Sequence, residues 1–251
     1  MLVPASPTYQ NRLLASLSET DLAQVRPYLE PVDLPLNTVL IEAGQPVAHA
    51  TFIEAGLGSV IVSAGEGDRV EIGLFGRDGF ACPALVLGSD RVPQQTFMQV
   101  GGHGYRIGAE EFRAIIDASP SFRGLLLRYT HTFLIQTAQT AHANATAPVQ
   151  ERLARWLLMY HDRQDGDELM ITHEFLSMML GTRRSTVTLA LQLLEGARLI
   201  QARRGRIRVL DRAGLEGTAG DAYGPAEAEY ERLIAPLCRR ADRPLPHHHS
   251  D

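Results

Sequence analysis

Residues 172–210, THEFLSMMLGTRRSTVTLALQLLEGARLIQARRGRIRVL, decide the fold of the C-terminal part of this 251-residue chain. Thr172 can cap a first helix, and Gly181 stands where a left-handed residue would end it. Thr182 can cap a second helix. The apolar residues of the two helices recur at helical spacing: Phe175, Leu176, Met179, Leu180, Val187, Ala190, Leu191 and Leu194. Two short helices joined by a glycine-containing turn predict a helix-turn-helix.

A strand, a turn and a second strand follow directly, which predicts a wing. The strands are the apolar runs 199–202 and 206–210, and the turn is 203–205. Charge is concentrated in the same region. From Arg183 to Arg212 the chain has eight arginines against two acids, a local charge of about +6 in a chain whose formal charge is −5. A basic patch on an acidic protein is what phosphate binding requires.

The second helix would read the DNA sequence. With Val187 at the centre of the buried side, the helical rotation places Ser185, Leu189 and Gln192 opposite it, flanked by Arg184 and Thr188. Arginine pairs with guanine, glutamine with adenine, and leucine can contact a thymine methyl group. We expect the DNA backbone to be contacted by Thr182, Arg183, Arg203, Arg204, Arg206 and Arg208. The alternative is a winged helix that packs only against protein.

The N-terminal part is predicted to be a compact β-barrel or sandwich. Short apolar runs, separated by glycine-rich turns such as 64–68, favour strands at 39–41, 51–53, 58–62, 70–75, 96–100 and 105–107. A helical stretch at about 10–29 precedes them.

One long helix is predicted over 121–147, and Pro148 suits the start of the next one, at a domain boundary. Along the helix predicted over 121–147, residues at alternating steps of three and four are Leu126, Tyr129, Phe133, Gln136, Thr140 and Ala143. These residues predict a dimer seam. The alternative is an amphipathic helix that packs on its own barrel.

Three segments of the C-terminal part, 151–158, 169–176 and 181–188, resemble the DNA-binding domain of the Crp/Fnr family of bacterial transcription regulators. Residues 73–80 resemble part of that family's cyclic-nucleotide-binding β-roll, and the similarity extends over about 30–235. The resemblance implies homodimers and an α+β fold. Its expected parts are a β-roll sensor at 10–120, a dimerisation helix at 121–147, a winged helix-turn-helix at 148–216, and a C-terminal helix with a disordered tail at 217–251.

By family position, Arg184 corresponds to a base-contacting arginine, whereas Ser185 and Leu189 stand where cyclic-AMP-type members carry charged readers. Members that bind a cyclic nucleotide hold its phosphate with an Arg-Ser or Arg-Thr pair after a Gly-Glu. Here Gln94 and Gln95 occupy the place of the pair, and the turn at 82–88 lacks Gly-Glu. Arg91 has the wrong spacing. Because a glutamine amide is a poor substitute for a guanidinium, we expect that cyclic AMP is not the effector.

Other chemistries find little support in the sequence. His103 and His131 are haem-ligand candidates by residue type alone, Cys82 and Cys238 are too few for a disulfide framework, and His247–His249 favour a disordered end over a metal site. No enzyme motif, cofactor site or metal site is expected. With no apolar membrane span and no secretory signal in residues 1–14, we expect a cytoplasmic protein that binds no membrane.

The sequence therefore predicts a homodimeric, sequence-specific transcription regulator that reads a near-palindromic operator. Its expected partners are double-stranded DNA, a second copy of itself and RNA polymerase, and the sequence identifies no effector. The alternative function is a small-molecule sensor that acts through a protein partner instead of DNA.

Overall fold

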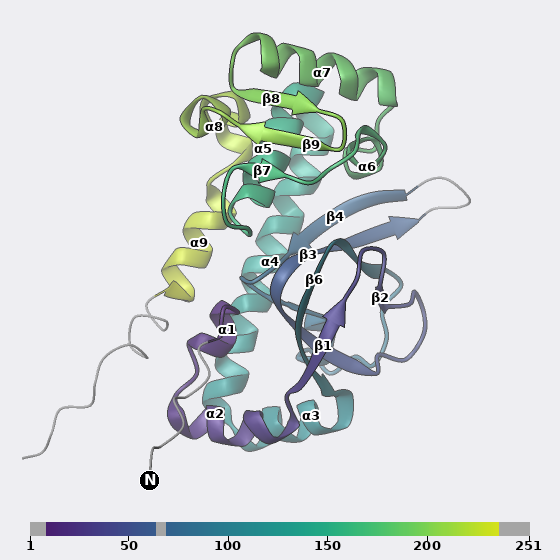
Figure 1. Cartoon of the computed structure of the whole chain (residues 1–251). Helices are drawn as coiled ribbons and strands as arrows, with labels where there is room; N and C mark the ends of the chain where they lie inside the picture. The colour runs from purple at the N-terminus through teal and green to yellow at the C-terminus, as the bar shows by residue number, and fades with distance from the viewer. Residues whose placement is uncertain (1–8, 64–68, 236–251) are drawn as a thin grey trace, which may run out of the picture.

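The computed structural model describes residues 9–63 and 69–235. They form a β-rich N-terminal domain, a long central helix and a smaller mixed domain at the opposite end, as the predicted α+β class requires (Figure 1). The turn predicted at 64–68 and the C-terminal segment that includes Cys238 and His247–His249 lie outside the described residues.

The N-terminal domain is an antiparallel sheet rolled around a core rich in phenylalanine. The sheet follows the order β1-β6-β3-β4, with β2 on β6 and β5 on β3. The strands are β1 (Glu30–Leu34), β2 (Val39–Ile41), β3 (His49–Ser63), β4 (Arg69–Phe75), β5 (Phe80–Ala81) and β6 (Gln95–Gly108). The helices are α1 (Arg12–Ala15), α2 (Glu19–Val25), α3 (Ala109–Ala118) and the 3-10 turns η1 (Arg26–Tyr28) and η2 (Pro83–Leu85). The stretch predicted as helical at 10–29 is thus broken, because Ser18 caps a new helix.

Strands predicted as separate are continuous. β3 joins the runs 51–53 and 58–62, and β6 joins 96–100 and 105–107. The glycines between these runs lie inside the strands, where two backbones approach closely. A Cβ on Gly102 would lie 1.9 Å from the carbonyl oxygen of Ala55, at a point where the pairing of β3 with β6 shifts register. Glycine here marks a close crossing of two strands instead of a turn.

The long predicted helix is present as α4 (Pro120–Thr146), but the prediction that its seam forms a dimer contact is wrong. Leu126, Tyr129, Gln136 and Ala143 are buried within the single chain, and Phe133 and Thr140 are half-buried. The backbone N–H of Leu74 donates to Gln136 Oε1 at 2.8 Å, which fastens the helix to β4. The seam therefore packs on the chain's own β-roll, as the alternative had it.

Two glycines, one in β4 and one in the turn before β5, explain why α4 can lie so close. A Cβ on Gly79 would lie 2.1 Å from the Tyr129 hydroxyl, and a Cβ on Gly73 would lie 2.8 Å from the Phe133 ring. The absent side chains leave room for aromatic rings of α4 directly on the sheet. Tyr129 also packs against Phe80, with ring centroids 5.3 Å apart.

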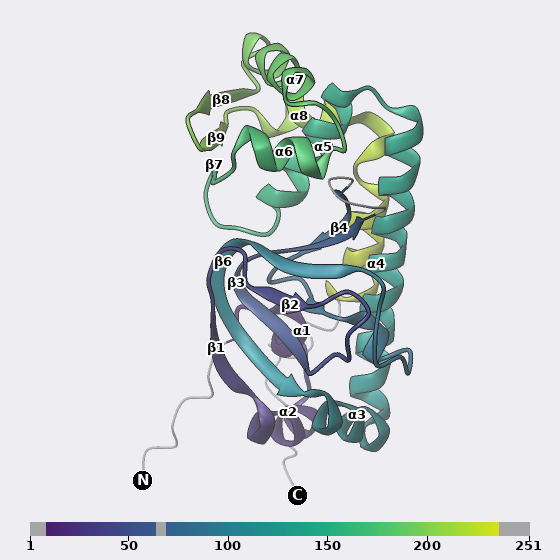
Figure 2. The ribbon, with the colours of Figure 1, turned by 90° about the vertical axis from the view of Figure 1, so that its right-hand side faces the viewer.

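The C-terminal domain begins after Pro148, which is the N-cap of the next helix. Its elements are α5 (Val149–His161), β7 (Glu168–Leu169), α6 (His173–Met179), α7 (Arg184–Gly196), β8 (Ile200–Arg203), β9 (Arg206–Val209), α8 (Arg212–Ala219), η3 (Gly220–Ala222) and α9 (Pro225–Leu233). Helix α8 spans the predicted boundary at 216–217 and packs on α5. Helix α9 turns back along α4 toward the β-roll (Figures 1 and 2), and Tyr230 and Ile234 join the β-roll core.

The two domains are packed against each other at several buried points. Trp156 of α5 donates its indole N–H to Glu71 Oε1 at 2.8 Å, and the Ser59 hydroxyl donates to the other oxygen. Burial raises the pKa of Glu71 to about 7, although these hydrogen bonds and the charges of Arg155 and Arg163 oppose the rise. Beside this contact, Arg163 and Asp78 form an ion pair of 2.7 Å across the domain boundary.

Among the helices that the structure describes, none combines the length and the hydrophobicity that a membrane-spanning segment needs. Within 9–63 and 69–235, no three histidine, cysteine or acidic side chains gather where they could hold a metal ion.

Candidate nucleic-acid interface

Helices α6 and α7 form the predicted helix-turn-helix. Thr172 caps α6 as predicted, because its side chain accepts a hydrogen bond from the backbone N–H of Phe175 at 3.3 Å. Gly181 has a φ of +54°, the left-handed conformation that ends the helix. Thr182 does not cap α7: the N-cap is Arg183, whose side chain makes no capping hydrogen bond to the backbone N–H groups of the first turn. The positive end of the α7 dipole is therefore open to an anionic partner.

The burial pattern of α7 matches the prediction. Val187, Ala190, Leu191 and Leu194 are buried against the domain core. Side chains that point to the opposite side are exposed, and they are Arg184, Ser185, Leu189 and Gln192. Thr188 is half-buried, and its hydroxyl donates to the carbonyl of Arg184 at 3.0 Å. Arg184, Ser185, Leu189 and Gln192 therefore share one solvent-facing surface, whereas Thr188 is partly turned into the domain.

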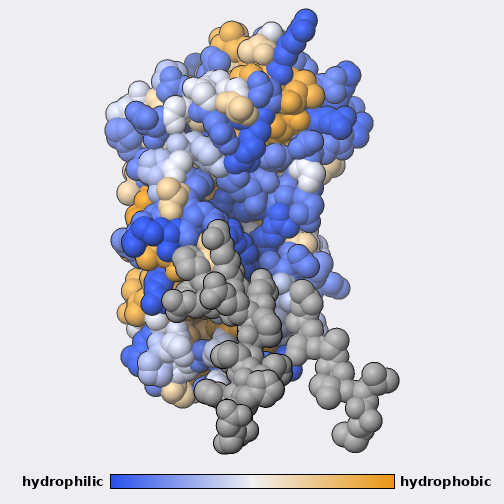
Figure 3. Space-filling view, turned by 90° about the vertical axis from the view of Figure 1, so that its left-hand side faces the viewer, coloured by the Kyte–Doolittle hydropathy of each residue, from blue (hydrophilic) through white to orange (hydrophobic). Residues whose placement is uncertain are grey.

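One exposed leucine of α7 was not predicted. Leu193 is 49% exposed and follows Leu189, which is 56% exposed, by one helical turn. The spacing of four residues could have identified it. Two exposed leucines on a helix of a basic domain extend the apolar part of this surface, and apolar and hydrophilic side chains mix at this end of the molecule (Figure 3).

The predicted wing is the hairpin of β8 and β9. Its turn is Arg204-Gly205, with Gly205 at a φ of +75°, and Arg203 and Arg206 stand opposite each other. Every predicted backbone-contacting arginine of the wing (Arg203, Arg204, Arg206 and Arg208) is exposed. The short strand β7, which was not predicted, pairs with β9 and brings Glu168 to 3.8 Å from Arg206. This carboxylate offsets part of the positive charge of the wing.

A groove of about 1060 Å³ separates the start of α7 from the β-roll. Arg183 and Arg184 line it from the C-terminal domain, and Arg69 of β4 lines it from the β-roll. Arg69 donates to Gln95 Oε1 at 2.7 Å. The basic surface thus includes an arginine from the other domain, which only the folded chain brings beside the helix-turn-helix.

A cationic pocket is not formed by the three residues at or near the expected cyclic-nucleotide position, Arg91, Gln94 and Gln95. Arg91 is exposed and pairs with Asp90 at 3.2 Å, and Gln95 bonds to Arg69 and Glu42. Gln94 lines a cavity beside Cys82, whose pKa is raised by burial. His131 lies on the surface, 3.5 Å from Glu229.

Comparison with known proteins identifies this helix-turn-helix. Residues 151–218 match the family model of the Crp-like helix-turn-helix domain. The match covers the C-terminal domain from α5 into α8. No curated protein matches the sequence.

Solved structures share the fold of this chain over most of its length. FixK2 from Bradyrhizobium japonicum has a TM-score of 0.67 at 12% identity, covering 78% of this chain and 99% of that one. A CRP/FNR-family transcriptional regulator from Thermus thermophilus has a TM-score of 0.63 at 22% identity, with 76% and 98% covered. The c-di-GMP responsive global regulator CLP of Xanthomonas campestris has a TM-score of 0.62 at 18% identity, with 76% and 99% covered.

Proposed function

We propose that this chain forms a homodimer that reads a near-palindromic DNA operator with two α7 helices. The observation that carries the proposal is the exposed surface of Arg184, Ser185, Leu189 and Gln192, beside a wing with four exposed arginines, on a chain whose net charge is −5. Local positive charge attracts the phosphate backbone, and the exposed side of α7 carries the groups that can discriminate base edges.

The dimer contact would be formed by the outer side of α4. Leu127 and Leu134 are 42% and 57% exposed, which is costly for large apolar side chains on an isolated helix. With His131, Ala138, Ala141 and Ala145, which are also exposed, they alternate by three and four residues along the helix. Figure 2 shows α4 along one edge of the molecule, where a second α4 can approach. The small alanines would allow close packing of the two helices near the DNA-binding domains.

Dimer symmetry sets the form of the operator. Two helix-turn-helix units related by a two-fold axis enter successive major grooves about 34 Å apart, so each half-site is read in opposite orientation. The wing arginines and the open start of α7 would hold the DNA backbone, and Arg69 would add charge at the edge of the same surface.

The sensor domain would not respond to cyclic AMP. A buried phosphodiester requires a charged donor, and Gln94 supplies only an amide. Arg91, the nearest arginine in sequence, is paired with Asp90 at the surface. Micromolar binding of cyclic AMP in calorimetry would contradict this part of the proposal.

Selection of bound DNA from a random pool, at about physiological salt, tests the proposal as a whole. We expect enrichment of a two-fold-symmetric sequence by the ligand-free protein. The variant Arg184→Ala should lose about 1–3 kcal/mol of specific binding, roughly 5- to 150-fold, and relax specificity at one position of each half-site.

Two matched variants give the controls. Arg204→Ala should weaken binding to all sequences about equally, whereas Arg26→Ala, an exposed arginine of the N-terminal domain, should change nothing. An enriched site without symmetry would contradict the homodimer. Absence of DNA binding would favour the sensor that acts through a protein partner.

A further inference from the structure

A cavity of about 270 Å³ lies between α4 and the inner side of the rolled sheet. Its apolar lining includes Val60, Ile72, Phe80, Leu87, Phe133 and Leu134. No charged side chain among the described residues lines this cavity. Small-molecule sites have this composition, with a mainly apolar wall and a few polar groups that fix orientation.

The polar groups of the cavity are mostly engaged within the protein. Thr130 and Thr137 donate their hydroxyls to carbonyl oxygens one turn earlier in α4, at 2.8 and 3.0 Å. The Cys82 thiol stays protonated, because burial raises its pKa. The remaining polar side chains of the wall are the buried Thr96 and the half-buried Gln94, whose amide can both donate and accept.

Such a wall discriminates strongly against charge. An ionised group loses its hydration on entry, and a cavity without a counter-charge does not replace it. An uncharged, largely apolar molecule would instead gain from the removal of its surface from water.

The cavity also touches the part of the molecule that a sensor must move. Leu134 lines the cavity and belongs to the exposed side of α4. Phe133, the adjacent residue, packs over Gly73 of β4. An occupant would thus contact the helix that we propose as the dimer contact, and it could act through a different affinity for two positions of α4.

We propose that the effector of this protein is an uncharged, largely apolar small molecule that binds between α4 and the sheet. As an effector, it rests on the proposed function as a regulator. The binding site itself can be tested without DNA, so the apolar site and the proposed regulator can each be disproved separately.

The test uses two probes that differ by one charged group. N-phenyl-1-naphthylamine is neutral, and 8-anilinonaphthalene-1-sulfonate is the same ring system with a sulfonate. We expect the full-length protein to bind the neutral probe saturably, with one site per chain, and the sulfonate at least 10-fold more weakly. Equal or tighter binding of the sulfonate, or no saturable binding of the neutral probe, would overturn the proposal.

Variants locate the site. Ile72→Trp fills the cavity and should weaken binding of the neutral probe at least 10-fold, whereas Val62→Trp, an exposed position on β3, should not. Ala84→Phe fills the cavity from the turn after β5 and serves where Ile72→Trp does not fold by circular dichroism. Binding that survives both filling variants, or that is lost in Val62→Trp, would contradict the assignment.

The same preparations are then tested for DNA selection. Probe binding without DNA binding would contradict the proposed regulator while leaving the apolar site in place. DNA binding without probe binding would overturn the apolar site alone.

Discussion

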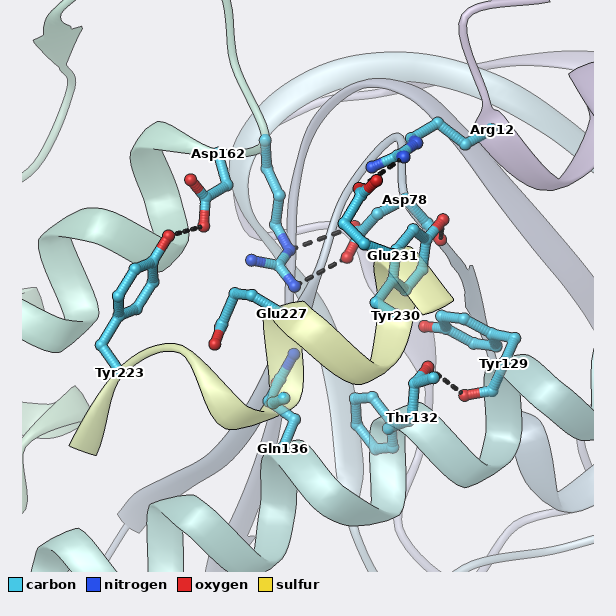
Figure 4. Close-up of a pocket in the computed structure, with 13 residues that line it drawn as sticks. Arg12, Asp78, Tyr129, Thr132, Gln136, Asp162, Tyr223, Glu227, Tyr230 and Glu231 are labelled. Carbon is cyan, nitrogen blue, oxygen red and sulfur yellow. Dashed lines mark hydrogen bonds and ion pairs between the residues drawn. The ribbon is translucent and has the colours of Figure 1, made fainter. Parts of the chain in front are cut away.

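Two cavities lie against α4, and they differ in chemistry although both are lined by Phe133. The cavity toward the sheet has no charged lining residue among the described residues. The other, about 310 Å³ between α4, α5 and α9, is lined by Asp78, Asp162 and Glu227 together with Arg163 (Figure 4).

The charged groups of the second cavity are engaged with protein partners from different elements. Arg163 binds Asp78 at 2.7 Å, the Tyr223 hydroxyl donates to Asp162 at 2.8 Å, and the Tyr230 hydroxyl donates to the carbonyl of Asp78 at 2.7 Å. These bonds join the β-roll, the end of α5 and α9. The bonds around the charged cavity thus join the two domains, whereas every residue that lines the apolar cavity belongs to the β-roll or to α4.

We expect the largest loss of stability from a substitution in the charged cavity. Asp78→Ala leaves Arg163 buried without its carboxylate, and we expect the free energy of unfolding in urea to fall by about 3–5 kcal/mol. The double variant Asp78→Leu with Arg163→Met should recover most of this loss, since it removes both charges. A loss below about 1 kcal/mol for Asp78→Ala would mean that the pair does not hold the domains.

Glu71 is a buried carboxyl at the same domain boundary as Asp78. Its hydrogen-bond donors, Ser59 and Trp156, are neutral, whereas Asp78 pairs with a charged arginine. With its pKa raised to about 7, the folded chain keeps a proton that the unfolded chain releases near its ordinary pKa of 4.5. Its contribution is therefore fully present below about pH 4.5, and stability falls by up to about 3 kcal/mol as pH rises through 7. Glu71→Gln should remove this slope in unfolding measurements from pH 5 to 8. An unchanged slope in the variant would contradict the assignment.

We expect the smallest change in stability at a surface ion pair that also crosses this domain boundary. Arg77 and Asp165 are also 2.7 Å apart, but the Asp165 side chain is 91% exposed. Asp165→Ala should change the free energy of unfolding by no more than about 1 kcal/mol, less so in high salt. A loss as large as that of Asp78→Ala would show that burial does not distinguish the two pairs.

Local signals made the helix-turn-helix domain predictable. A cap at Thr172, a left-handed Gly181 and apolar spacing in α7 act over a few residues, so the sequence was sufficient for the helix-turn-helix and for the exposed side of α7. Thr182 failed as a cap because the helix begins later, after Arg183. Boundaries are set by competing local bonds, here the hydrogen bond from the Ser177 hydroxyl to the Thr182 carbonyl.

Local sequence signals were sufficient for the helix-turn-helix with its wing and for the concentration of arginine on it. The tertiary structure decided which side of α4 is buried, because two neighbouring stripes of that helix share heptad spacing and only contact with the sheet distinguishes them. It also decided that glycines in β3 and β6 mark a crossing of backbones, and that α9 returns to join the domains. These outcomes depend on contacts between residues far apart in the chain, and local periodicity carries no information about such contacts.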